Sequence, residues 1–184
     1  FSFVPNRRRT LVCFLVAFTI IAVLWTRIQP SNRRDWQQDV AVLPWATIQG
    51  PLVTLHNIRN FTYRTRHDFD IRYEEREVLL SHLQTVDLFV SYWRDGPVGH
   101  TFLSFGFDNA PPVSISIETR PEIGEGFDPI ASLFKQFELI YLVGNEHDLV
   151  GSRAIHRNEK IFLYRIRTTP ENARQLFLIY LERI

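Results

Sequence analysis

The chain has 184 residues, of which 45% are hydrophobic and 22% are charged. This composition is typical of a folded protein and excludes a disordered one, and the length accommodates one soluble domain beside a membrane anchor. The 21 lysines and arginines nearly balance the 20 acidic residues, and the two signs are interspersed along the chain. We therefore expect no nucleic-acid partner, because a protein that binds nucleic acid gathers positive charge on one surface.

The strongest change in composition lies near the N-terminus, where three arginines precede an apolar run at 11–25. At about 1.5 Å per helical residue this run is about 22 Å long, short of the roughly 30 Å hydrocarbon core unless the flanking threonines extend it. No small-residue cleavage site of a signal peptide follows it. Three arginines on either side leave the orientation open. We predict a cytoplasmic flank at 1–9, an uncleaved transmembrane anchor at 10–26 and a polar juxtamembrane linker at 27–44.

Cysteine and histidine usage gives little chemistry by itself. Cys13 is the only cysteine and lies inside the apolar run, so we expect it to be a poor nucleophile, far from any general base. The histidines show neither H-x-x-x-H nor H-E-x-x-H spacing. The sequence therefore predicts no metal site and no cofactor.

Strand and helix patterns follow the linker. Two short strands are predicted around Gly50–Pro51, and the apolar run at 86–93 predicts a buried central strand. Helices that face the core are predicted to begin at Asp128 and Thr169, because each of these N-cap residues precedes a proline. Further strands are predicted at 99–108, 113–119, 138–144 and 160–166. The predicted fold class is α+β, an antiparallel sheet with flanking helices, preceded by one transmembrane helix.

The strands at 99–108 and 113–119 carry a candidate acid/base pair. A simple hairpin centred near Asn109 places His100 directly opposite Glu118 on the more polar face. Opposed residues lie about 4.5–5.5 Å apart at Cβ, so the carboxylate can fix the tautomer of the imidazole, and a thiol or hydroxyl would complete a triad. The alternative is that both residues belong to a solvated face, and a slip of one residue in register would separate them.

Several stretches from about Arg34 to the end of the chain match, in order, the pattern of a known family. They are RDWQQDVAVLPWATI, IRNFTYRTRHDFDIRYEER, VDLFVSYW, GHTFLSFGFD, ISIETRPEIGEGF, FKQFELIYLVGNEHDL and FLYRIRTTPENARQLFLIYL. With these motifs the chain resembles the Lnb N-terminal periplasmic domain family. The resemblance implies a fold related to circularly permuted papain-like thiol enzymes of the NlpC type.

The resemblance also implies an activity and a site. The best-described branch of the family transfers an acyl chain to the N-terminal amine of bacterial lipoproteins at the outer face of the inner membrane. His100 is similar to the catalytic histidine, and Glu118 would orient it, an assignment that depends mainly on the hairpin register. The expected partners are membrane phospholipid and a lipoprotein substrate, and the expected location of the globular domain is the periplasm.

The cysteine of the family lies in an Asn-Cys-Thr-type motif beyond the final helix. We therefore expect 45–184 to be the N-terminal part of a periplasmic thiol-enzyme-like domain that ends before its nucleophile and is inactive as given. Two other classes stay open: a thiol amidase or peptidase that acts on cell-wall peptide with the same pair, and a membrane-anchored binding module that uses neither residue.

Overall fold

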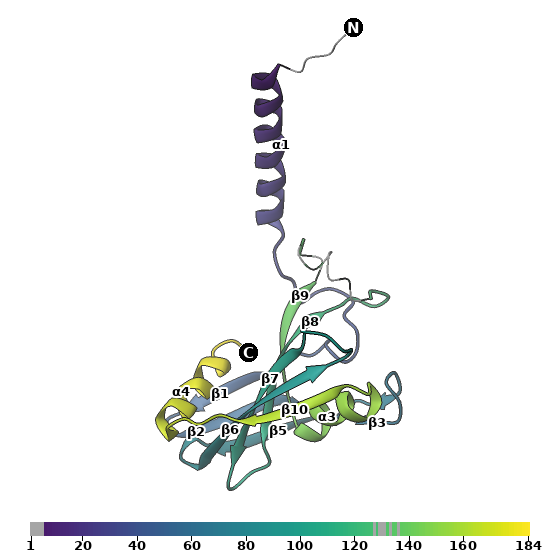
Figure 1. Ribbon diagram of the computed structural model, residues 1–184. Helices are drawn as coiled ribbons and strands as arrows, with labels where there is room; N and C mark the ends of the chain where they lie inside the picture. The colour runs from purple at the N-terminus through teal and green to yellow at the C-terminus, as the bar shows by residue number, and fades with distance from the viewer. Residues whose placement is uncertain (1–5, 127, 129–131, 133, 136) are drawn as a thin grey trace.

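The computed structural model describes residues 6–126, 128, 132, 134, 135 and 137–184. Its first element, helix α1 (Arg7–Arg27), extends away from the globular part (Figure 1) and buries none of its side chains. The side chain of Asn6 caps this helix by accepting a hydrogen bond from the N–H of Arg8 at 3.2 Å. With 21 residues α1 is about 32 Å long, so it is long and apolar enough to cross a membrane. The prediction of an apolar helix outside the core is confirmed.

Eight strands form one sheet in the part of the chain that the structure describes. They are β1 (Trp45–Gln49), β2 (Leu52–Arg59), β5 (Tyr73–Leu79), β6 (Leu83–Tyr92), β7 (His100–Phe107), β8 (Val113–Arg120), β9 (Glu138–Gly144) and β10 (Lys160–Arg165). The spatial order is β1-β2-β9-β8-β7-β6-β10, and β5 pairs with β2. A short 3₁₀ turn, η1 (Leu80–His82), precedes β6, and β3 (Thr62–Tyr63) pairs with β4 (Phe69–Asp70) in a second, small sheet.

One junction of the large sheet differs from the prediction. β2 and β9 pair in parallel, through Arg59 and Gly144, so the sheet is mixed rather than antiparallel throughout. The register of β2 against β5 shifts between Leu55 and Ile58, where Asn57 has a positive φ of 58°. Such an irregularity bends a strand, and the parallel pair lies beyond it, at the last residue of β2.

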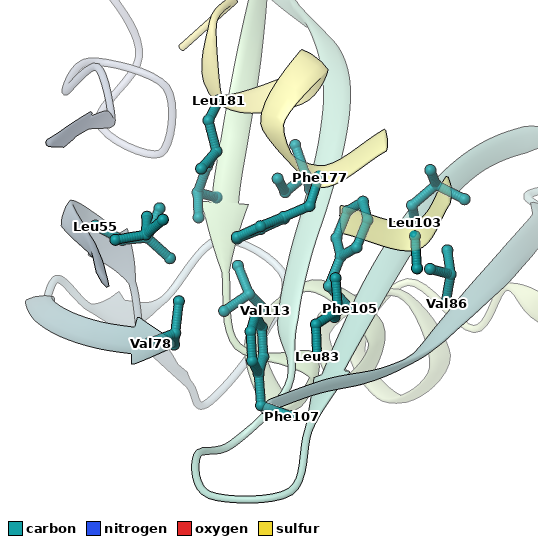
Figure 2. Packing of buried hydrophobic residues seen from close by; sticks show 14 of the residues in the cluster. Leu55, Val78, Leu83, Val86, Leu103, Phe105, Phe107, Val113, Phe177 and Leu181 are labelled. Carbon is teal, nitrogen blue, oxygen red and sulfur yellow. The ribbon is translucent and has the colours of Figure 1, made fainter. Parts of the chain in front are cut away.

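Helix α4 (Pro170–Leu181) covers one face of the sheet. It begins as predicted, since the Thr169 side chain accepts a backbone hydrogen bond and a proline follows. Phe177 is fully buried and its ring centroid lies 4.8 Å from that of Phe105 and 5.6 Å from that of Phe107. Figure 2 shows this packing, in which alternate residues of β7 and β8 meet the buried side of α4. The main hydrophobic core therefore lies on this face.

A second helical segment, not predicted from the sequence, covers the opposite face. Helix α3 (Glu146–Gly151) continues into the π-helical turn η2 (Ser152–His156). Asp148 of α3 is fully buried and pairs with Arg59, whose Nη2 lies 2.6 Å from the carboxylate. The same carboxylate accepts the N–H of Phe61 at 2.8 Å. These bonds fix α3 to the end of β2.

The helix predicted to begin at Asp128 falls largely outside the described residues, because 127, 129–131, 133 and 136 are not among them. Two of its apolar residues can be placed. Phe137 is 8% exposed, whereas Phe134 is 69% exposed. The prediction that both face the core is therefore wrong for Phe134.

Part of the predicted linker packs on the end of the sheet. Trp36 is buried beneath the guanidinium of Arg120, which lies 4.3 Å from the centroid of the indole ring. Arg120 also donates hydrogen bonds to the carbonyls of Val40 at 2.9 Å and Ala41 at 2.8 Å. Since Arg120 is the last residue of β8, the chain that leaves α1 is fixed to that end of the strand.

Candidate active site

The predicted hairpin register is correct. β7 and β8 pair antiparallel through Leu103 with Ile115 and Ser104 with Ser114. In this register His100 falls opposite Glu118, and its Nε2 lies 3.1 Å from the Glu118 Oε1. Both side chains are partly buried, with 25% and 20% of their surfaces exposed. The predicted proximity of imidazole and carboxylate is confirmed.

Ser116 joins this pair and fixes the position of a proton. Its Oγ lies 2.8 Å from the Nε2 of His100 and donates a hydrogen bond to the Glu118 Oε1 at 2.5 Å. A hydroxyl has one proton to give, so Ser116 can only accept from His100. In the neutral imidazole, Nε2 therefore carries the hydrogen and Nδ1 carries the lone pair. Within the described residues Nδ1 makes no hydrogen bond.

Arg153 of η2 is the third group that contacts Glu118. Its guanidinium donates to the same Oε1, and its Nη1 donates to the carbonyl of Leu149 at 2.6 Å. The side chain is 3% exposed and lies over the ring of Phe102, 4.8 Å from the centroid. The ring of Phe102 is in turn stacked near that of His100, with 6.1 Å between centroids. Arg153 thus joins η2 to the two strands that carry the pair.

The charge state of Glu118 follows from these contacts. Burial raises the pKa of this carboxyl, but the hydrogen bond from His100 and the charge of Arg153 outweigh it, with a further contribution from Ser116. The net effect lowers the pKa of Glu118 to about 2. The group is therefore a carboxylate at neutral pH, able to accept hydrogen bonds and to stabilise an imidazolium.

A polar layer continues along the same face of the sheet. Ser114 donates to the Oγ of Ser104 at 3.2 Å, and Ser104 donates to Glu146 of α3 at 2.6 Å. Both serines are buried. The alternation of polar and apolar residues in β8 would suggest that this face is exposed to solvent. In the structure α3 and η2 cover it, and these serines are hydrogen-bonded.

The site lies at the end of the sheet nearest α1. Arg120 follows Glu118 by two residues, about 7 Å along β8. Its Nη1 donates at 2.8 Å to the side chain of Asn32, five residues beyond the end of α1. Figure 1 shows the corresponding ends of β8 and β9 beneath α1. The chain that leaves α1 is therefore held at the same end of β8 that carries Glu118.

The arrangement can act as a base but carries no accessible nucleophile of its own. Ser116 is fully buried, so its hydroxyl cannot meet a substrate. Cys13 lies in α1. No cluster of potential metal ligands occurs among the residues that the structure describes. What these groups offer is a lone pair on Nδ1 of an oriented imidazole, beside an ionised carboxylate.

Comparison with known sequences places the chain in a family. The sequence model of the Lnb N-terminal periplasmic domain matches residues 70–184, more than half of the chain. The chain belongs to this family. The match begins at the end of β4 and includes His100, Glu118 and Arg153. Neither the curated proteins nor the solved structures that were compared with the chain gave a match.

The family and α1 together indicate a membrane-anchored periplasmic domain. Within it, sequence reasoning identified two members of the site and missed two. Ser116 shares the parity of Glu118 along β8, a signal that was available. Arg153 has no local signal, because it reaches Glu118 only through the packing of a helical segment that the sequence pattern did not predict.

Proposed function

We propose that this domain belongs to a membrane-anchored periplasmic thiol acyltransferase in which His100 is the general base. The reaction moves an acyl chain from a phospholipid to the N-terminal amine of a lipoprotein. The observation that carries the proposal is the orientation of His100: its Nε2–H is held by Ser116 and an ionised Glu118, so that Nδ1 is left as a base near the anchor. Family resemblance supplies the papain-like mechanism and the thiol.

The first half-reaction starts at Nδ1. This nitrogen takes the proton of a cysteine thiol, and the thiolate attacks the ester carbonyl carbon of a phospholipid. The bond from that carbon to the glycerol oxygen breaks, the imidazolium returns its proton to this oxygen, and a lysophospholipid leaves. The acyl chain stays on the cysteine as a thioester.

The second half-reaction reverses the proton path. His100 takes a proton from the α-amine of the lipoprotein as the amine attacks the thioester carbonyl. The carbon–sulfur bond breaks, an amide forms, and the thiolate regains its proton from the imidazolium. Because the acyl donor and the lipidated acceptor both reside in the membrane, the anchor raises their concentration at the site.

Glu118, Ser116 and Arg153 are positioning residues in this scheme. Glu118 holds the imidazole in the tautomer that leaves Nδ1 free, and its charge stabilises the imidazolium that forms in each half-reaction. Ser116 adds a second acceptor for Nε2–H. The charge of Arg153 helps to lower the pKa of Glu118, and its guanidinium donates a hydrogen bond to the carboxylate.

The test uses the full-length protein in membranes that contain phospholipid with a labelled acyl chain. Mass spectrometry first locates the cysteine that becomes acylated. His100→Ala should reduce thioester formation by about 100-fold or more, the usual contribution of a general base. His67→Ala is the matched control. It removes an exposed histidine that takes no part in the candidate site and should leave the rate unchanged.

Each outcome decides something. Full thioester formation in His100→Ala would remove His100 as the base. Cleavage of cell-wall peptide that depends on His100, with no thioester from phospholipid, would establish the amidase or peptidase class instead. The absence of any acylated cysteine in the unsubstituted protein would favour a binding module.

A further inference from the structure

Trp25 and Lys135 mark the level at which the globular domain meets the end of α1. Trp25 lies in the last turn of α1, the position at which a tryptophan typically occupies the membrane–water interface. The ammonium of Lys135 lies 3.9 Å from the centroid of the indole ring and donates to the Trp25 carbonyl at 3.3 Å. Lys135 and its neighbour Phe134 are therefore close to the depth of that interface.

Three of the most exposed apolar side chains of the domain lie at the same end. Outside α1, five large apolar side chains in the described residues are at least 60% exposed. Two of them, Ile123 and Phe134, lie in the connection from β8 to β9, and a third, Leu139, is the second residue of β9; their exposures are 69%, 69% and 70%. The other two flank the candidate site: Val98 precedes His100 by two residues, and Ile155 follows Arg153 by two. Single exposed apolar residues are normal, but three of them beside the segment that follows α1 indicate a contact surface.

Hydrogen bonds hold Ile123 and Leu139 beside the chain that leaves α1. The N–H of Ile123 donates to the carbonyl of Asp35 at 2.7 Å. The carboxylate of Glu138, next to Leu139, accepts the N–H of Ser31 at 2.8 Å. Both apolar residues are thus held beside the segment 31–35 that follows α1.

Charge does not account for this surface. The cations here are Arg27, Arg33, Arg34, Arg120 and Lys135, and the acidic groups are Asp35, Glu122, Glu125, Asp128 and Glu138. Arg34 is paired with both Glu122 at 3.1 Å and Glu138 at 3.4 Å. The two signs are equal in number, so net charge gives this surface no attraction to phospholipid headgroups, and any attraction must come from the apolar side chains.

We propose that Ile123, Phe134 and Leu139 insert into the lipid leaflet from which α1 emerges, so that the domain rests on the membrane. Side chains of this kind enter the boundary between headgroups and acyl chains. His100 then lies near the level of the headgroups, with Val98 and Ile155 at its rim. The proposal concerns the position of the domain and does not depend on any reaction at His100.

The test measures depth in the bilayer for the whole chain. The chain is reconstituted at one copy per lipid nanodisc, with Cys13→Ala as background, and single cysteines at 123, 134 or 139 carry an environment-sensitive fluorophore. Phospholipids with a spin label on the acyl chain should quench most of the emission at these positions. Asn109→Cys is the control, since this exposed residue lies at the far end of β8, roughly 25 Å away. Its emission should not change.

Ile123→Cys and Leu139→Cys are independent probes on opposite ends of the connection, so a folding defect in one leaves the other informative. Quenching at both, without quenching at Asn109→Cys, supports the proposal. Emission that is blue-shifted but unquenched would show that a protein surface covers these residues, and emission typical of water would show that the domain stands away from the bilayer. Either result overturns the proposal, and neither bears on thioester formation.

Discussion

The two faces of the strands β7 and β8 are covered in chemically different ways. On one face Phe105 and its neighbours pack against α4 through apolar contacts alone. On the other, Ser104, Ser116 and Glu118 meet α3 and η2 through hydrogen bonds and ion pairs. Residues of the two faces alternate along the same strands, so each strand contributes apolar side chains to the contact with α4 and polar side chains to the contact with α3 and η2.

The two faces contribute differently to the stability of the domain and to the geometry of the candidate site. Apolar burial is roughly proportional to area and tolerates changes of shape, provided that volume is kept. A buried polar layer gains little net free energy from each bond, but every unpaired group in it is costly, so it admits one arrangement. The α4 face therefore stabilises the domain, and the α3 face fixes the orientation of His100.

The largest effect is expected from the apolar face. Phe177→Ala should lower the free energy of unfolding by about 4 kcal/mol, because it removes a fully buried ring and leaves a cavity between α4 and the strands. Ile179→Ala, on the exposed side of the same helix, should cost less than about 0.5 kcal/mol. Urea unfolding of both variants measures this difference, and equal losses would contradict the placement of the core.

The polar face should show its own large effect at the buried ion pair. Asp148→Asn should cost about 3 kcal/mol, because Arg59 would keep a buried charge without a counter-charge, although the amide oxygen can still accept one hydrogen bond. Asp68→Asn changes an exposed carboxylate that also pairs with an arginine and should have no measurable effect. Urea unfolding at neutral pH gives both values. A stability of Asp148→Asn equal to that of the unsubstituted protein would mean that the pair does not hold α3.

Local sequence patterns predict much of the face that α4 covers and two of the four residues of the candidate site. The proline-rich turn and the alternation in β7 and β8 fix one register, and with it the proximity of His100 and Glu118. The cap at Thr169 likewise predicts the start of α4. These features depend on residues that are close in sequence, so elementary rules are sufficient.

The second face depends on contacts between residues that are far apart in sequence. Arg153 lies 35 residues beyond Glu118, and Asp148 lies 89 residues beyond Arg59. Alternation along β8 predicts which residues share a face, but it does not predict whether water or a helix covers them. The parallel junction of β2 and β9 is missed for the same reason, since it joins Arg59 to Gly144 across a wide gap in sequence.

Stability near pH 3 should distinguish the polar face from the apolar one. The folded-state pKa of Glu118 lies at about 2, below its ordinary value of 4.5, so its contribution to stability is complete above pH 4.5 and is lost as the pH falls through that window. The linkage amounts to about 3 kcal/mol. The difference in unfolding free energy between the unsubstituted protein and Glu118→Gln should therefore shrink from pH 6 toward pH 2. Glu182→Gln, an exposed control, should follow the unsubstituted protein at every pH, and a constant difference for Glu118→Gln would refute the lowered pKa.

The smallest effect on stability should be the most informative about His100. Ser116→Ala and Ser114→Ala each remove a fully buried hydroxyl from the same face of β8, and each should cost about 1 kcal/mol, the net contribution of one hydrogen bond. Only Ser116 contacts the imidazole. In ¹⁵N NMR spectra, Ser116→Ala should therefore shift the ring signals of His100, whereas Ser114→Ala should leave them in place. Ring signals that stay unchanged in both variants would mean that Ser116 does not share the Nε2–H, and Glu118 would then fix the tautomer without help.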